Sequence, residues 1–106
     1  MKGRQQMTTT TTNFSDLARS LALLANATRL SILDYLKTHP GATVEEDLVV
    51  FLGLPQSVVS RHLRVLRRAG VVIFDERGTG AFKTHRYSLK SQVIQDDAEA
   101  LAALAS

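Results

Sequence analysis

Hydrophobic residues recur at helical spacing through much of this 106-residue chain. Between residues 14 and 25 they return every three or four positions, which predicts a helix with one apolar face. Asn13 stands directly before this stretch and suits the N-cap position. A second helix is predicted over residues 27–38 and should end before Pro40, because proline cannot continue the hydrogen-bond ladder of a helix. The pattern therefore predicts two consecutive helices before residue 40.

The next stretch carries the signals of a helix-turn-helix motif. Thr43 and Glu46 match a capping box, in which each side chain satisfies the other's free backbone donor, and they predict a third helix up to Leu52. Gly53 suits a left-handed helix exit. A fourth helix is predicted over residues 55–69, with a proline in its first turn, where the missing N–H costs nothing. A helix, a tight glycine turn and a second helix are the parts of a helix-turn-helix.

A β-hairpin and a last helix follow this motif. Residues 71–74 are β-rich, residues 75–80 contain two glycines typical of a hairpin tip, and residues 83–89 can form the returning strand. Apolar positions at helical spacing predict the last helix over residues 92–105. The predicted fold is thus mainly α-helical with a small β-hairpin, in the order four helices, two strands and one helix, within one domain over residues 13–106.

Composition narrows the class of protein. With 44% hydrophobic and 22% charged residues, the chain has the make-up of an ordinary globular domain, and no apolar run approaches the ~18 residues of a membrane span. Residues 1–12 end in a run of threonines and predict a mobile arm rather than a signal peptide, so we expect a cytoplasmic protein. The chain has no cysteine, which excludes disulfides and thiolate metal sites. We expect no cofactor and no metal.

The fourth predicted helix has two contrasting faces. At about 100° per residue, Val59, Leu63 and Leu66 fall in one apolar arc. His62 falls in the same arc, and we interpret it as a buried, hydrogen-bonded structural histidine. The opposite arc contains only polar and basic residues, namely Gln56, Ser57, Ser60, Arg61, Arg64, Arg67 and Arg68.

The positive charge of the chain is concentrated around this helix. Residues 54–90 hold eight basic and two acidic residues, a net charge of +6, whereas the rest of the chain sums to −3. This asymmetry is typical of a nucleic-acid-binding surface, and arginine, glutamine and serine are side chains that bond base edges and phosphates. We expect contacts to base edges or nearby phosphates from Gln56, Ser57, Ser60 and Arg61. Farther along the helix, contacts to the DNA backbone are expected from Arg64, Arg67 and Arg68. In the hairpin, contacts to the flanking minor groove or its phosphates are expected from Arg77, Thr79, Lys83 and Arg86.

Three segments resemble the ArsR/SmtB family of regulators, and they are residues 24–33 (LANATRLSIL), 54–72 (LPQSVVSRHLRVLRRAGVV) and 87–89 (YSL). The resemblance covers about residues 14–105. It implies a winged helix-turn-helix protein that binds a palindromic operator in double-stranded DNA as a homodimer and represses transcription. In this family the first and last helices pair across the two-fold axis of the dimer. The resemblance therefore implies a dimer interface that contains Phe14, Leu17, Leu21, Ile94, Leu101 and Leu104.

The sensor site of the best-known family members is missing from this sequence. Val44 and Glu46 stand where those members carry a cysteine pair, and the last helix offers Asp96, Asp97 and Glu99 without a histidine. Carboxylates alone are poor zinc ligands, so metal sensing is disfavoured. Three properties stay open: an unidentified small-molecule effector, the operator sequence, and the choice between repression and activation.

Two other functions are weighed against DNA binding. A winged helix can serve as a protein-interaction module without sequence-specific DNA binding, and the fold alone does not decide between the two. An enzyme is not expected, because the sequence shows no nucleophile–base pattern, no glycine-rich phosphate loop and no cluster of metal ligands. The role of Arg29 is open as well, since it can contact phosphate or pair with Asp34.

Overall fold

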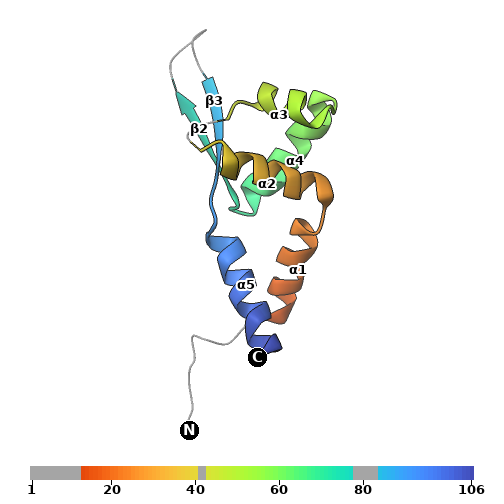
Figure 1. Ribbon diagram of the computed structural model, residues 1–106, viewed down its shortest axis with the longest axis vertical. Helices are drawn as coiled ribbons and strands as arrows, with labels where there is room; N and C mark the ends of the chain where they lie inside the picture. The colour runs from red at the N-terminus through yellow and green to blue at the C-terminus, as the bar shows by residue number, and fades with distance from the viewer. Residues whose placement is uncertain (1–12, 41–42, 78–83) are drawn as a thin grey trace.

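The computed structural model describes residues 13–40, 43–77 and 84–106 (Figure 1). The mobile N-terminal segment predicted at residues 1–12 lies outside these ranges, as does half of the predicted hairpin tip. The predicted order of elements is confirmed. The elements are α1 (Phe14–Leu24), α2 (Ala27–Thr38), α3 (Glu45–Leu52), α4 (Gln56–Arg68), β2 (Val72–Arg77), β3 (Thr84–Leu89) and α5 (Gln92–Ala105).

The described residues form a head and a helical arm (Figure 1). The head consists of α2, α3, α4 and the antiparallel hairpin of β2 and β3, in which Val72 pairs with Leu89. The arm consists of α1 and α5, which run side by side away from the head. One continuous core fills the head and contains Ile32, Leu33, Leu36, Leu48, Val59, Leu63, Leu66, Val71 and Val72.

Local sequence signals account for most helix ends. The Asn13 side chain accepts a hydrogen bond from the Asp16 backbone N–H at 3.1 Å, so the predicted N-cap of α1 is confirmed. Gly53 closes α3 with φ 65°, in the left-handed region that favours glycine. The turn between α3 and α4 therefore takes the course that the sequence predicted, and it sets the direction in which α4 leaves the head.

The predicted capping box at Thr43 and Glu46 is wrong. Thr43 lies before α3 and pairs with Tyr87 of β3: the Thr43 N–H donates to the Tyr87 carbonyl at 3.1 Å, and the Tyr87 N–H donates to the Thr43 carbonyl at 2.8 Å. The helix begins at Glu45, after Val44 at the N-cap position. The backbone of Thr43 thus extends the hairpin sheet by one bridge, and this bridge joins the start of α3 to the hairpin.

The arm leaves apolar side chains in solvent. Phe14 at the start of α1 is 59% exposed, and Leu101 and Leu104 in the last turns of α5 are 43% and 65% exposed. Within the arm, the Ser20 hydroxyl of α1 donates to the Asp97 carboxylate of α5. None of the helices within the described ranges is long and apolar enough to cross a membrane.

Candidate nucleic-acid interface

The helix α4 presents a polar surface because its apolar side is fixed in the core. Val59, Leu63 and Leu66 are at most 1% exposed and pack inside the head. The division of α4 into an apolar and a polar face, predicted from helical spacing, is confirmed. On the polar face Ser60 is half-buried, and the exposed residues are Gln56, Ser57, Arg61, Arg64, Arg67 and Arg68.

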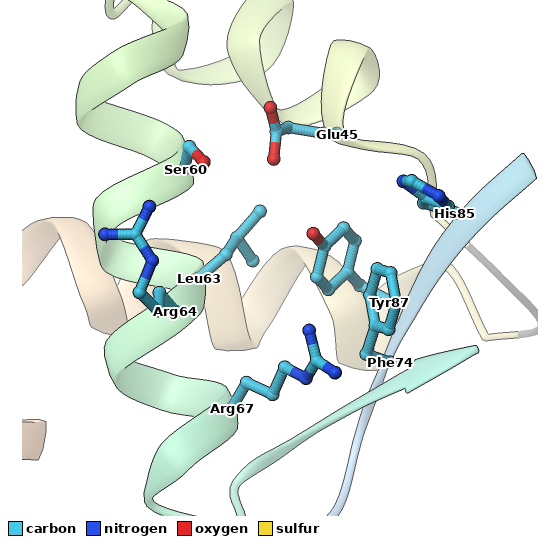
Figure 2. Close-up of a pocket in the computed structure, with 8 residues that line it drawn as sticks. All are labelled: Glu45, Ser60, Leu63, Arg64, Arg67, Phe74, His85 and Tyr87. Atoms are coloured by element: carbon cyan, nitrogen blue, oxygen red, sulfur yellow. The ribbon is translucent and has the colours of Figure 1, made fainter. Parts of the chain in front are cut away.

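A groove runs between α4 and the hairpin, and Figure 2 shows the side chains that line it. We call it the wing groove. It has a volume of about 330 Å³ and is lined by Glu45, Ser60, Leu63, Arg64, Arg67, Phe74, His85 and Tyr87. The Arg67 guanidinium lies over the Phe74 ring, with 4.1 Å between its central carbon and the ring centroid. This cation–π contact holds α4 against β2.

Glu45, Tyr87 and His85 were not among the predicted site residues. The Gln56 amide nitrogen donates to the Glu45 carboxylate at 2.9 Å, so a predicted base-reading side chain is hydrogen-bonded to a residue that lines the wing groove. Burial raises the pKa of the Tyr87 hydroxyl, and the nearby Glu45 charge raises it further. Tyr87 therefore keeps its proton at neutral pH and is a hydrogen-bond donor. The sequence did contain a signal for His85 and Tyr87. Side chains alternate between the two faces of a strand, so residues 85 and 87 share one face of β3.

The remaining predicted DNA contacts belong to the hairpin, and only some of these residues lie within the described ranges. Arg86 is half-buried in β3, where it pairs in register with Asp75. The neighbouring His85 Nε2 lies 2.8 Å from the Glu76 carboxylate. Arg77 ends β2, whereas Thr79 and Lys83 lie outside the described residues. The structure thus places two of the four hairpin candidates, Arg77 and Arg86, on the two strands next to α4.

His62 faces away from the wing groove, toward the start of α2. It is half-buried rather than fully buried, and its Nδ1 accepts a hydrogen bond from the Arg29 Nε at 3.2 Å. Of the predicted buried, hydrogen-bonded structural histidine, the hydrogen bond is confirmed, whereas the side chain is only half-buried. Arg29 also donates from Nη1 to the Leu23 carbonyl at 2.9 Å, so its guanidinium pairs with these two groups and not with Asp34.

Acidification should destabilise the protein through His62. Burial lowers its pKa below the ordinary value of 6.5, and the charges of Arg29 and Arg61 lower it further, so the unfolded chain takes up the proton more readily. The stabilisation is therefore complete above about pH 6.5 and is lost as the pH falls through the lowered pKa. Urea denaturation at about pH 7.5 and 5.5 should show a larger loss for the wild type than for His62→Asn. Equal losses would contradict this assignment.

Comparison with known proteins adds to this geometry. A family model described as a helix-turn-helix domain matches residues 24–73. The chain is 36% identical over 84 residues to the HTH-type transcriptional regulator NmtR of Mycobacterium tuberculosis, and the match covers 76% of this chain and 68% of that protein. These matches include α2, α3 and α4, the elements that build and support the polar face.

Solved structures share the fold. The transcriptional repressor PagR of Bacillus anthracis matches with a TM-score of 0.63 and 28% identity, over 83% of this chain and 94% of that one. An ArsR-like transcriptional regulator from Rhodococcus sp. RHA1 matches with a TM-score of 0.67 and 22% identity, over 87% of this chain and 81% of that one. The head, the hairpin and the arm are thus arranged as in known regulators.

Proposed function

Because this chain belongs to the ArsR/SmtB family of winged helix-turn-helix transcriptional regulators, we propose that it represses transcription by binding a palindromic operator as a homodimer. It is a regulator and not an enzyme. One observation carries the proposal of direct DNA reading. The exposed face of α4 carries four arginines and no acidic residue, and the opposite face of the same helix is locked in the core. A rigid helix with such a face suits the major groove.

The two ends of α4 have different tasks in this proposal. Its N-terminal half enters the groove deepest, so Gln56, Ser57, Ser60 and Arg61 contact base edges. Arg64 and Arg68 lie farther along and bind phosphates. Arg67 contacts the ring of Phe74 in β2. In this proposal it therefore binds the DNA backbone where the DNA passes between α4 and the hairpin. The hairpin residues Arg77, Thr79, Lys83 and Arg86 contact the adjacent minor groove or its phosphates.

The arm supplies the dimer interface in this proposal. Phe14, Leu101 and Leu104 are the predicted interface residues that solvent reaches, and an apolar surface of this kind suits a second copy. Leu17 is buried, and Leu21 and Ile94 are half-buried. Ile94 packs against the core of the head. In this proposal all three residues support the interface from beneath. The two copies of α4 would then lie about 34 Å apart, one turn of DNA.

Selection from a random duplex pool, followed by affinity measurements on the selected sequence, tests DNA reading. Gln56→Ala and Arg61→Ala should each reduce discrimination between the selected duplex and point variants by roughly five- to 100-fold, because a bidentate base contact is lost. Lys37→Ala removes an exposed positive charge from α2 and is the matched control, with the discrimination of the wild type. Sequence preference that survives both substitutions would contradict the assignment of these residues to base edges.

The salt dependence of binding separates DNA reading from a protein-interaction function. A dimer that neutralises several phosphates should lose affinity by roughly 10³-fold or more between 50 and 200 mM salt. Affinity for the duplex that barely changes over this range would favour a winged-helix module whose main partner is a protein.

A further inference from the structure

One guanidinium joins three helices on the side of α4 that faces away from the hairpin. Arg29 lies in the first turn of α2, where its backbone N–H donates to the Asn26 side chain at 3.1 Å. Its Nη1 donates to the carbonyl of Leu23, at the end of α1, and its Nε donates to His62 on α4. We call Leu23, Arg29 and His62 the arginine brace. Figure 1 shows the end of α1 meeting the start of α2 where the arm joins the head.

The brace requires one protonation state of His62. Its Nδ1 accepts from Arg29, so the ring is neutral and carries its proton on Nε2. An imidazolium carries protons on both nitrogens and cannot accept this hydrogen bond. It would also add a third positive charge beside Arg29 from α2 and Arg61 from its own helix, the two charged groups that act on His62. Protonation therefore opposes the brace through the lost acceptor and through charge repulsion.

The brace acts at the middle of α4, next to the N-terminal half that the proposed function assigns to base reading. His62 directly follows Arg61, and Val59, Leu63 and Leu66 hold the neighbouring side of the helix in the core. Apolar contacts resist separation but have little directional preference, whereas a hydrogen bond fixes direction. The brace therefore fixes the rotation of α4 relative to α1. Because α1 belongs to the arm, which supplies the proposed dimer interface, the same contact sets the orientation of α4 in each subunit relative to the proposed dimer axis.

We propose that the arginine brace positions α4 for operator binding, and that acidification releases the brace and weakens binding. This inference rests on the proposed function, since it concerns regulation of the same surface. The sign of the effect is distinctive. Protonating a histidine ordinarily adds positive charge and strengthens binding to DNA. Here protonation of His62 displaces the Arg29 guanidinium that holds α4, so the affinity for DNA falls instead.

Affinity for the selected duplex, measured by fluorescence anisotropy at constant salt between about pH 7.5 and 5.5, tests the brace. The wild type should lose about tenfold in affinity over this range, the size expected for one hydrogen bond to a charged group. His62→Asn places an amide oxygen near the position of Nδ1 and does not titrate. It should match the wild type at pH 7.5 and keep its affinity at pH 5.5. His62→Leu and Arg29→Met should bind weakly at both pH values.

His39→Asn is the matched control, because it removes an exposed histidine at the end of α2, outside the wing groove, and leaves the brace intact. It should keep the pH profile of the wild type. A wild-type affinity that rises or stays constant on acidification would overturn the inference, as would a His62→Asn variant that loses affinity as the wild type does. The His62→Asn profile decides the matter even if His62→Leu fails to fold.

The brace can also be tested without DNA. Nitrogen-15 NMR of the wild type at neutral pH should show His62 with an unprotonated Nδ1, and a protonated Nδ1 would overturn the inference. If no duplex is selected at pH 7.5 while Nδ1 is unprotonated, the proposed function fails and not the brace. The two failures are therefore distinguishable.

Discussion

A protein that carries Leu101→Glu and Leu104→Glu should be monomeric and should bind its operator at least 100-fold more weakly than the wild type. Both leucines lie on the exposed face of α5 in the arm. Two carboxylates on that face would have to be desolvated in a dimer, which is costly without a partner charge. A monomer engages one half-site at a time and loses the gain of roughly 10²–10⁴ from linked binding. Sedimentation and anisotropy measure the two effects.

Val50→Glu provides the control for this experiment. Val50 is 82% exposed on α3 in the head, so the substitution introduces one carboxylate at an apolar surface position away from the arm. This variant should remain dimeric. If the double variant also remains dimeric, the arm is not the interface, and the head surface near Val50 becomes the next candidate.

Replacing Leu66 by alanine should lower the free energy of unfolding by about 3 kcal/mol, within the 2–5 kcal/mol typical of such core truncations. Leu66 is fully buried, and its carbonyl accepts the Val71 N–H at 3.1 Å at the turn into β2. The cavity would therefore open between α4 and the hairpin. Since small domains are stabilised by only about 5–15 kcal/mol, a large share of the stability would be lost. Urea denaturation measures this change.

Leu30→Ala is the matched control, because it is the same substitution at a position in α2 that is 53% exposed. It should cost less than about 1 kcal/mol, since most of the side chain is already in water. Equal losses for the two variants would mean that Leu66 is not packed in the core as described.

Short-range patterns predicted the helices well, because their signals lie within a few residues. The bounds of α2 and α5 agree with those expected from apolar spacing, and Asn13 and Gly53 have the roles that their side-chain chemistry suggested. Thr43 shows where this reasoning ends. Its spacing to Glu46 fits a capping box, but its backbone pairs with Tyr87 in β3. A pairing between residues so far apart in the chain leaves no periodic signal in the sequence.

The candidate site was predictable as a face but not as a groove. Helical spacing separated the polar residues of α4 from the apolar ones, since both sets lie on one regular element. The wing groove combines residues from α3, α4, β2 and β3, so spacing along one helix could not predict Glu45 or Tyr87 as neighbours of Ser60. For the same reason the sequence left Arg29 open, and its contact with His62 depends on how α2 packs beside α4.

The pairing of Thr43 with Tyr87 has a consequence for the shape of the DNA that this protein can accept. It joins the segment that leads into the helix-turn-helix to the hairpin, while Arg67 and Phe74 join the far end of α4 to the same hairpin. With both ends of the helix-turn-helix joined to the hairpin, the separation between α4 and the hairpin is set before DNA arrives. We therefore expect affinity to depend on how readily the duplex adopts the matching groove width, even at base pairs that no side chain touches.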